Sequence, residues 1–265
     1  MWSRDVPLFD PNFGDAGQVY EPWVWLGALA GSTSRIALST AGIVLPLRHP
    51  LHSAKAAASV DALSGGRFML GAASGDRAVE YPAFGRDHAT RGESYREAIE
   101  VIRRTTSEAY PRVAGSWGAM EGLDLLPKSP VLPLASVGGA QQSVQWIAEH
   151  MDAWVTYPRD LEAQKGRIGL WKAAVEARAP GLFRPFAQSL FVDLTEDPGT
   201  APSDIFLGYR LGRNALIDHL AGLEAMGVNH VAINLRHAAR PASDVIEELA
   251  ETVLPHFPAH KGTDQ

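Results

Sequence analysis

Strand-like and helix-like segments alternate along most of this 265-residue chain, and this pattern restricts its fold more than any other feature. Apolar runs such as 36–45 and 68–73 contain few polar residues, which is typical of strands buried on both faces. Helical spacing of apolar residues follows these runs, as in 51–63 and 92–104. Parallel strands joined by helices are therefore expected, which means an α/β fold. Strands are predicted to begin at residues 36, 68, 131, 153, 186 and 230, and the later helices to cover 143–150, 161–177, 214–226 and 242–256.

Two architectures fit this order of elements. Six predicted strands suit an open, doubly wound sheet, whereas a closed β/α barrel needs eight strands. The interval between the strands at 68 and 131 is about twice that of the preceding strand–helix unit, so an insertion is expected at about 75–130. The opening segment, Trp2-Ser-Arg-Asp-Val-Pro7, has the pattern of the end of a strand without its beginning.

The composition argues against several functional classes. The 24 Lys and Arg residues against 30 Asp and Glu residues give a net charge of −6. Nucleic-acid and anionic-membrane partners both need a basic surface, so neither is expected. The chain has no cysteine, which excludes disulfides, thiolate catalysis and cysteine-ligated metals. No secretory signal and no membrane-length apolar run occur, so a cytoplasmic location is expected.

Ligands of both architectures bind at the carboxyl ends of the strands. Three loops at such ends carry polar residues or glycines: 41–50, which includes Arg48 and His49, then 73–77 and 138–143. In the third loop, Gly138 and Gly139 lie between a strand and a helix, where free N–H groups and the helix dipole favour a phosphate. Ser143 is expected to cap that helix or to donate to the phosphate. A Gly-Gly pair in this position is also common in simple turns.

Other candidate residues have simpler explanations. His49 and His52 are three residues apart, but no third ligand is near them in the sequence, so no metal site is expected. The sequence contains no nucleophile elbow, P-loop, zinc-protease motif or dinucleotide-binding turn. Hydrolase and nucleotidase functions therefore have no motif to support them.

A family pattern covers residues 43–85. It comprises Ile43-Val-Leu-Pro-Leu-Arg-His-Pro50, Ala54-Lys55, Val60-Asp-Ala-Leu-Ser-Gly-Gly-Arg-Phe-Met-Leu-Gly71, Ala73-Ser-Gly-Asp76 and Tyr81-Pro-Ala-Phe-Gly85. These segments resemble the bacterial luciferase-like monooxygenases, a family of flavin-dependent oxidoreductases. The resemblance continues through 139–157 and 227–235, and so covers nearly the whole chain.

The resemblance implies a single (β/α)8 barrel domain of the TIM type over residues 1–265. The six predicted strands then correspond to strands three to eight of the barrel. Strand one and most of strand two are expected to be absent, which suggests that the sequence is incomplete at its N-terminus.

The resemblance also implies that FMN, or a deazaflavin coenzyme as the alternative, binds at the carboxyl ends of the strands. Arg91 would contact the cofactor phosphate, because a guanidinium forms a bidentate pair with phosphate. A non-prolyl cis peptide beside the flavin ring is expected at Ala41-Gly42. The cofactor-binding residues implied are Ala41, Gly42, Ser74, Gly75, Arg91, Gly138, Gly139, Ala140 and Ser143.

Catalytic residues are less clearly indicated by the resemblance, because the flavin itself carries the difficult chemistry. Arg4 and Asp5 occupy the end of the second barrel strand, where Arg4 would stabilise negative charge on the reduced ring or a bound anion. The alternative is that Arg4 and Asp5 simply pair with each other. His49 is a further catalytic candidate, or only a hydrogen-bonding residue of its turn. Residues 195–213 correspond to the family's mobile lid, or to an ordinary surface loop.

The function implied is oxidation of a small organic substrate by reduced FMN and oxygen. The alternatives are hydride transfer with a deazaflavin and flavin binding without turnover. A flavin reductase or another supplier of reduced flavin is a possible partner. Relatives suggest a homodimer, with the Trp23 and Trp25 segment as part of its interface.

Overall fold

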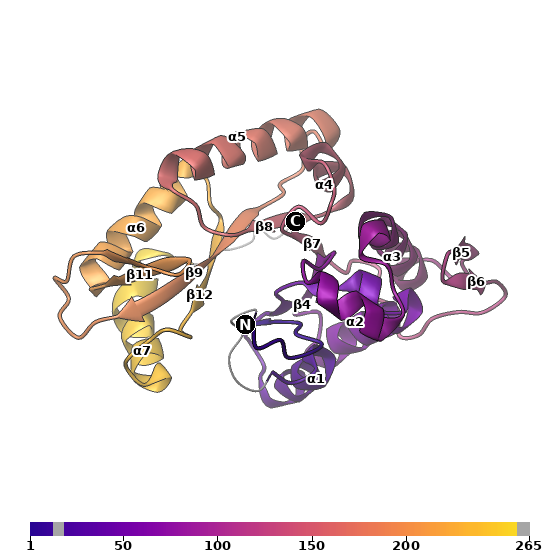
Figure 1. Ribbon diagram of the computed structural model, residues 1–265, viewed down its shortest axis with the longest axis horizontal. Coiled ribbons are helices and arrows are strands. Elements are labelled where there is room, and N and C mark those ends of the chain that lie inside the picture. Colours follow the sequence, from indigo (N-terminus) through magenta and orange to yellow (C-terminus); the bar gives the residue numbers. More distant parts are fainter. Residues whose placement is uncertain (13–18, 259–265) are drawn as a thin grey trace. The chain divides into compact units, whose positions relative to one another are not determined.

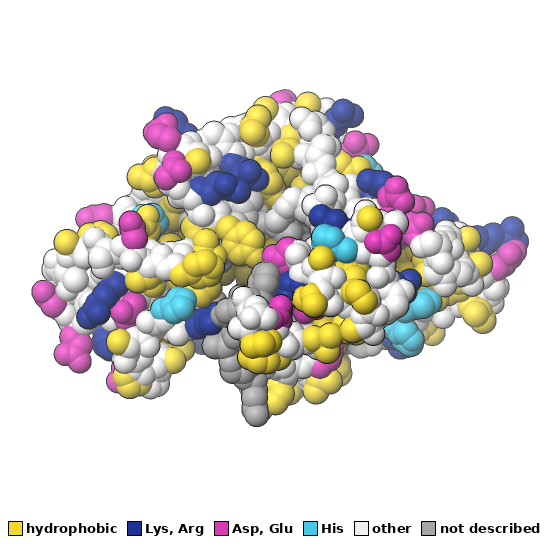
Figure 2. Space-filling view, viewed as in Figure 1, with side chains coloured by type: hydrophobic (Ala, Val, Ile, Leu, Met, Phe, Trp, Pro, Cys, Tyr) yellow, Lys and Arg dark blue, Asp and Glu magenta, His cyan; other side chains and the backbone are white. Residues whose placement is uncertain are grey.

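The computed structural model describes residues 1–12 and 19–258. The chain divides into two compact units, Met1–Trp154 and Val155–Gln265, and each unit is described by itself (Figure 1). On the face drawn in Figure 2, basic, acidic and apolar side chains are interspersed. Within the described ranges, no helix combines the length and the apolar character needed to cross a membrane.

The first unit is built on a parallel sheet in the order β1-β2-β4-β7, and β3 pairs with the second half of β4. Leu38 lies opposite Phe68, and Leu70 lies opposite Leu134. All four of these side chains are buried, as the apolar runs of the sequence predict. The strands are β1 (Trp2–Ser3), β2 (Leu38–Thr40), β3 (Ile43–Val44), β4 (Phe68–Ala73) and β7 (Leu134–Val137), and β8 (Ala153–Thr156) lies where the units meet in sequence.

The strand predicted over 36–45 is divided into β2 and β3. Gly42 has a φ of +103°, a left-handed conformation that interrupts a strand and that favours glycine. A Cβ at this position would lie 3.0 Å from the Cβ of Ala73, so the turn is packed directly against the end of β4. The division therefore coincides with a left-handed residue that is packed against the end of β4.

The helices of the first unit are α1 (Pro22–Ser32), α2 (Pro50–Ser64), α3 (Arg91–Ser107) and α4 (Val144–His150). Gly65 ends α2 in a left-handed conformation, with its N–H donating to the carbonyl of Ala62. Glycine adopts this conformation readily, so it is a common C-terminal cap. Tyr95, Ile99 and Ile102 of α3 are buried, as their spacing predicts. Apolar spacing does not reveal α1, because that helix is apolar on nearly every side.

The insertion predicted at about 75–130 contains short elements besides α3. A two-stranded antiparallel hairpin consists of β5 (Val113–Gly115) and β6 (Gly118–Met120). Two short 3-10 segments, η2 (Ala78–Phe84) and η3 (His88–Thr90), precede α3, and η1 (Leu45–Leu47) follows β3.

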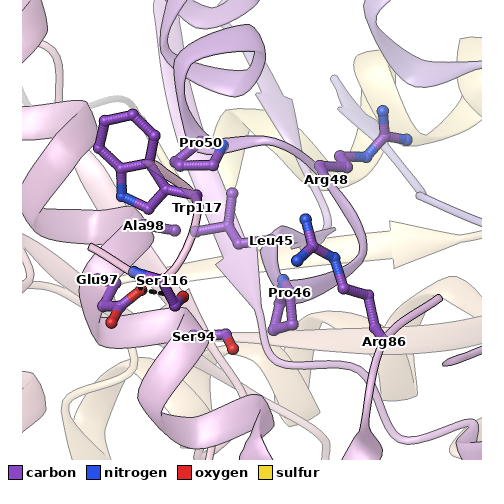
Figure 3. Close-up of a pocket in the computed structure, with 10 residues that line it drawn as sticks. All are labelled: Leu45, Pro46, Arg48, Pro50, Arg86, Ser94, Glu97, Ala98, Ser116 and Trp117. Atoms are coloured by element: carbon purple, nitrogen blue, oxygen red, sulfur yellow. Dashed lines mark hydrogen bonds between the residues drawn. The ribbon is translucent and has the colours of Figure 1, made fainter. Parts of the chain in front are cut away.

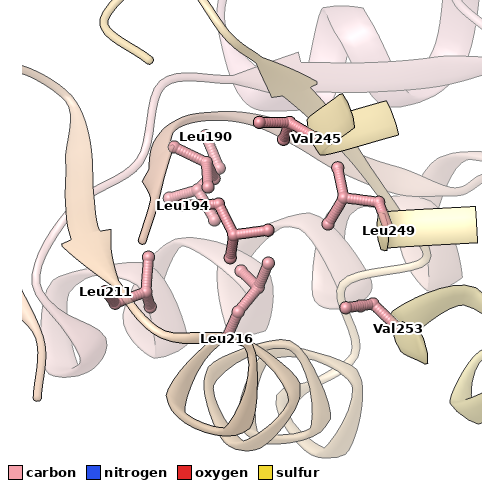
Figure 4. Close-up of a cluster of buried hydrophobic side chains, with 8 residues drawn as sticks. Leu190, Leu194, Leu211, Leu216, Val245, Leu249 and Val253 are labelled. Atoms are coloured by element: carbon pink, nitrogen blue, oxygen red, sulfur yellow. The ribbon is translucent and has the colours of Figure 1, made fainter. Parts of the chain in front are cut away.

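The strands of the second unit are organised around β9. β11 and β12 pair parallel with β9, and β10 pairs antiparallel with β11. Buried leucines and valines of β9 and β11 pack against the helices that follow them (Figure 4). The elements are α5 (Leu161–Arg178), β9 (Phe186–Leu194), β10 (Ser203–Ile205), β11 (Gly208–Leu211), α6 (Arg213–Met226), β12 (His230–Asn234), α7 (Ala242–Glu248), η4 (Leu249–Val253) and η5 (Leu254–His256).

The segment 195–213, expected as a lid or a surface loop, contains the β10–β11 hairpin. Gly208 allows β11 to approach β9, since a Cβ there would lie 1.8 Å from the carbonyl oxygen of Phe191. Pairing with β9 therefore gives much of this segment regular structure, despite its content of Pro, Gly and Asp.

Replacing Gly71 by alanine is expected to lower the free energy of unfolding by about 2 kcal/mol, because the packed strands must move apart. A Cβ on Gly71 would lie 2.0 Å from the carbonyl oxygen of Thr40. Urea unfolding measures the change. Gly169→Ala is the control, because its Cβ would meet no atom within 4 Å and should raise stability by up to about 1 kcal/mol. Equal effects of the two substitutions would contradict the role given to Gly71.

Candidate functional site

The loops that follow the parallel strands of the first unit meet at one edge of its sheet. A Cβ on Gly42 would lie 3.0 Å from the Cβ of Ala73 and 3.2 Å from that of Val137. A Cβ on Gly75 would lie 2.7 Å from Cγ1 of Val44. The structure thus brings together the three loops that the sequence singles out after β3, β4 and β7. In an α/β fold this edge is where ligands bind.

The loop 138–143 has an unusual backbone. Gly138, Ala140 and Gln141 have φ angles of 70°, 45° and 59°. Turns that contain left-handed residues can direct successive N–H groups toward one side of a loop, which is a common way to bind an anion. The Nε1–H of Trp154 donates to the carbonyl of Gly138 at 2.8 Å, so this conformation is anchored to the core. Non-glycine residues held with positive φ are a feature of functional sites.

Ser143 caps α4, which is the first of the two roles considered for it. Its Oγ accepts a hydrogen bond from the backbone N–H of Trp146 at 3.1 Å. The hydroxyl proton of a serine that accepts in this way can still be donated to a second group.

The N-terminus of α3 packs against the same loop. Nε2 of Gln142 donates to the carbonyl of Gly92 at 2.9 Å, and its Oε1 accepts from Arg96 at 3.1 Å. Gly92 permits this approach, because a Cβ there would lie 2.9 Å from the Cβ of Gln141. Arg91 therefore lies next to the loop, as the family resemblance implies. Gly92, Arg96 and Gln142 carry no recognisable signal in the sequence.

The guanidinium of Arg91 is only partly satisfied by the protein. One terminal nitrogen donates to the carbonyl of His88 at 2.7 Å. Its Nε is buried and has no hydrogen-bond partner within the described part of the chain, and the same holds for Nε2 of His88. A buried N–H without a partner is uncommon in proteins. A phosphate oxygen would satisfy it, so this residue fits the phosphate group of a cofactor.

Ser74 and Gly75 are held by Tyr81. The Tyr81 hydroxyl donates to the Ser74 carbonyl, and Gly75 has a φ of +77°. The Tyr81 ring also packs edge-to-face on His88 with a centroid distance of 4.9 Å. Tyr81 therefore joins the loop after β4 to the segment that carries Arg91. Its burial raises the pKa of the phenol to about 12.

Tyr81→Phe is expected to lower the free energy of unfolding by about 1 kcal/mol at pH 7, because one buried hydrogen bond is lost. An unfolded tyrosine has a pKa of about 10. Since the folded protein keeps this proton to about pH 12, the stability from neutral Tyr81 is present below pH 10 and lost as pH rises through 12. Urea unfolding at pH 7 and pH 11 measures both effects. If the unmodified protein and Tyr81→Phe differed in free energy of unfolding by the same amount at pH 7 and pH 11, the stabilising role of the neutral phenol would be contradicted.

The cis peptide expected at Ala41-Gly42 is wrong. The one cis bond among the described residues joins Leu126 and Pro127. The break between β2 and β3 is made instead by the positive φ of Gly42, and the chain continues in the same direction, since both strands pair parallel with β4. Ala41 still lies at the carboxyl edge of the sheet, where its N–H donates to the carbonyl of Ser3 at 2.7 Å.

Asp5 forms an ion pair with Arg48. Its side chain is fully buried, and its oxygens accept from Nη2 and Nε of Arg48 at 2.8 and 3.2 Å and from the N–H of Val44 at 2.9 Å. Arg48 also pairs with the more exposed Glu21 at 2.9 Å. The Asp5 carboxylate thereby holds the turn after β3 in place. Arg4, the neighbouring candidate, has an exposed side chain at the same end of β1.

His49 caps the N-terminus of α2, in line with the simpler of its two expected roles. Its Nδ1 accepts from the N–H of Leu51 at 3.3 Å, and its ring packs edge-to-face on Trp117 at 5.5 Å. Burial, followed by the positive charges of His52 and Arg86, lowers its pKa. These contacts place His49 between α2 and the β5–β6 hairpin.

A small pocket lies between η1, α3 and the tip of this hairpin (Figure 3). Glu97 accepts from the Ser116 hydroxyl at 2.6 Å on one side, and the Arg86 guanidinium points toward Leu45 on the other. A second, open hollow of about 540 Å³ is lined by the start of α2, by Trp23 and by Phe84. Arg48 lines both cavities. Among the described residues, no three His, Cys, Asp or Glu side chains lie together as a metal site would require.

A family model described as luciferase-like monooxygenase matches residues 8–253. An uncharacterized protein of Mycobacterium tuberculosis is 34% identical over 62% of this chain. The alkanal monooxygenase alpha chain of Photorhabdus luminescens is 25% identical over 60% of the chain, and the F420-dependent hydroxymycolic acid dehydrogenase of Mycobacterium tuberculosis is 30% identical over 62%. This chain spans 63% of the length of the first relative and 46% of the length of the other two.

Two solved structures share the fold. The monooxygenase from Streptomyces bottropensis has a TM-score of 0.78 at 17% identity, covering 90% of this chain and 83% of that one. An F420-dependent secondary alcohol dehydrogenase in complex with an F420–acetone adduct also has a TM-score of 0.78 at 17% identity. The match covers 97% of this chain and 89% of that one. These likenesses confirm the α/β fold of the TIM-barrel type.

Proposed function

The chain belongs to the luciferase-like monooxygenase family, and on that premise we propose that it is a flavin-dependent oxidoreductase that uses reduced FMN and oxygen to oxidise a small organic substrate. The observation that carries the proposal is the buried, unsatisfied Nε of Arg91, in the described part of the chain, beside the left-handed loop 138–143. A phosphate-bearing cofactor supplies the acceptor that this arrangement lacks.

The proposed cofactor site uses residues of the first unit alone. Arg91, the N–H groups of 138–140 and the Ser143 hydroxyl would hold the phosphate, while Ala41-Gly42 and Ser74-Gly75 would line the ring. When bound, the reduced flavin supplies the electrons for the reaction with oxygen. Tyr81 contributes by fixing the Ser74 carbonyl, and its neutral phenol adds no charge to the site at pH 7.

Arg4 is proposed to stabilise negative charge on the reduced ring or on a bound anion, because it is exposed at the carboxyl end of β1. Asp5 is proposed to act differently. Its carboxylate accepts three N–H groups, so it positions Arg48 and the turn at Val44 rather than exchanging a proton with substrate. His49 is likewise proposed to position the start of α2.

Hydride transfer with the deazaflavin F420 is the second candidate function. The relative that is named as an F420-dependent dehydrogenase favours it. The Arg91 site alone does not separate the two, because F420 also carries a phosphate. The expected result is that purified protein binds FMN more tightly than F420 and forms product only with oxygen. If F420 bound more tightly than FMN and the substrate were reduced or oxidised without oxygen, hydride transfer with F420 would replace oxidation by reduced FMN and oxygen as the function.

A stoichiometric flavin complex that oxidises no substrate with any reductant would support the third alternative, flavin binding without turnover. Substrate trials should include a flavin reductase, because a monooxygenase of this kind needs reduced flavin from a supplier.

The self-association of the chain is also a proposal. Val24 and Trp25 of α1 are 72% and 40% exposed, which supports α1 as a contact between two copies. Sedimentation of Trp25→Ser against the unmodified protein tests it.

A further inference from the structure

The strands around β9 in the second unit present two unlike faces. Leu190 and Leu194 of β9 are buried and pack with residues of α6, α7 and η4 (Figure 4). Side chains alternate along a strand, so Phe191 and Asp193 lie on the other face. Asn234, the last residue of β12, pairs with Phe191, so this part of the face lies at the carboxyl edge of β12. Ligands of α/β folds bind at such edges.

Three aromatic rings meet at this edge. The ring centroid of Phe191 lies 6.0 Å from that of Phe206 and 5.3 Å from that of His237. Phe191 is buried, whereas Phe206 is 67% exposed and His237 is exposed as well. The centroids of the two outer rings are 6.5 Å apart and their planes differ by 81°, so Phe206 and His237 form an open corner. A planar aromatic ligand in this corner would stack on one ring and meet the edge of the other.

The backbone holds Phe206 in its exposed position. Phe206 and Leu207 make the turn between β10 and β11. Leu207 has a φ of +52°, which is uncommon for a residue other than glycine, and its carbonyl accepts from the N–H of Phe191 at 3.0 Å. The turn is thereby fixed to β9. An apolar ring that is exposed on a fixed turn is already placed for a ligand, so little conformational entropy is lost on binding.

Arg210 of β11 adds a positive charge to the same face. It pairs with Asp193 across the two strands, just as Gly208 pairs with Phe191, so Arg210 lies about 7 Å along the strand from the aromatic rings. Its side chain is 58% exposed. Within the described ranges its one ion pair is with Asp193, and the 3.7 Å from Nε to the carboxylate oxygen is too long for a hydrogen bond. Asp193 itself accepts from the N–H of Ala239 at 2.9 Å, so the guanidinium keeps its N–H groups for another carboxylate.

The charge of the neighbouring segment also favours an anion. Residues 230–240, from the start of β12 to the loop before α7, contain two His and two Arg but no Asp or Glu. Arg240 is paired with Glu248 at 2.6 Å, whereas Arg236 and His237 are exposed beside the rings. A ligand with an aromatic body and a carboxylate therefore complements both the rings and the charge at this edge.

We propose that this edge of the second unit binds an aromatic carboxylate, whose ring lies against Phe206 and His237 and whose carboxylate accepts hydrogen bonds from Arg210. Every residue of the site belongs to the second unit, whereas the residues proposed for the flavin belong to the first. The site therefore goes beyond the proposed function, and its ligand is measured without flavin.

The probes are 2-naphthoate, the neutral 2-naphthylmethanol and the saturated decalin-2-carboxylate, titrated into the flavin-free full chain by calorimetry. One 2-naphthoate is expected to bind per chain, at least about fivefold more tightly than either analogue, because only 2-naphthoate has both the aromatic ring and the charge. Phe206→Ala is expected to weaken 2-naphthoate about tenfold and to remove its advantage over decalin-2-carboxylate. Arg210→Met should weaken 2-naphthoate about tenfold and leave 2-naphthylmethanol unchanged.

Phe183→Ala and Arg178→Met are the matched controls, because Phe183 is 77% exposed and Arg178 is exposed at the end of α5, both in the second unit. Neither should change the binding of 2-naphthoate. FMN binding should be unchanged in Phe206→Ala and Arg210→Met, so a failure of this site is distinguished from a failure of the proposed function.

Three results would each overturn the aromatic carboxylate site. The first is no binding of 2-naphthoate, or binding no tighter than that of 2-naphthylmethanol. The second is a loss in Arg178→Met equal to that in Arg210→Met. The third is a loss in Arg91→Ala as large as that in Arg210→Met, because the ligand would then bind at the edge of the first unit.

Discussion

Arg91→Ala is expected to weaken FMN binding about 100-fold and riboflavin binding far less, because only FMN carries the phosphate. A hydrogen bond to a charged group contributes about 1.5–3 kcal/mol, and each 1.4 kcal/mol is a tenfold change in the dissociation constant. Nε of Arg91 is already buried without a partner in the described structure, so the phosphate has little further desolvation of this side chain to overcome. Quenching of flavin fluorescence measures both ligands under the same conditions.

Arg104→Ala is the matched control for this experiment. Arg104 is in the last turn of the same helix, α3, and pairs with Glu108 at 3.2 Å on the surface. Arg104→Ala should leave the binding of FMN and of riboflavin unchanged. Arg91→Lys should recover part of the affinity for FMN, because a point charge replaces only part of a bidentate contact. Equal losses of FMN and riboflavin in Arg91→Ala would remove Arg91 from the phosphate site.

Asp5→Asn is expected to lower the free energy of unfolding by about 3–4 kcal/mol. The Asp5 side chain is fully buried, and the substitution leaves the charge of Arg48, whose side chain is 23% exposed, without its main partner. Removing one member of a buried ion pair costs about 3–5 kcal/mol. The neutral amide also presents only one acceptor oxygen to the N–H groups of Arg48 and Val44. Urea unfolding at pH 7 measures the loss.

Glu121→Gln tests whether burial is the cause. Glu121 pairs with Arg112 at 2.9 Å, but both side chains are largely exposed, so the expected change is within about 0.5 kcal/mol. When Arg48→Met is added to Asp5→Asn, the free energy of unfolding should fall little further, because the ion pair between Asp5 and Arg48 has already been lost. Losses that simply add in the double variant would show that Asp5 and Arg48 contribute separately.

Much of the fold could be predicted from the sequence because the signals are local. Strand β4 has the boundaries that its apolar run predicts, and strand β9 begins at the predicted residue, Phe186. Helix α2 ends at Gly65, since only a residue that accepts a left-handed conformation makes this cap readily. The family resemblance is confirmed by the match over residues 8–253.

The candidate site could be predicted only in part. The Gly138–Ser143 loop carries a local signal, because glycines precede a helix start. The contact of its Gln142 with Gly92 depends on the packing of α3, which no local pattern records. The same holds for the link from Ser74 through Tyr81 to His88, which joins three turns across the edge of the sheet.

By itself, the sequence determined the order of most of the longer strands and helices, the cap at Ser143 and the glycine-rich loop, because backbone conformation and apolar spacing depend on neighbouring residues. The tertiary structure decided which side chains pair. Asp5 is next to Arg4 in the chain, yet its carboxylate binds Arg48, 43 residues away, because burial at the sheet edge places these two charges together. It also decided the backbone at Gly42, where packing against Ala73 and Val137 accompanies a positive φ in place of a cis bond. Charges and turns at this edge are set by what lies across the sheet, and that is information that only the folded chain contains.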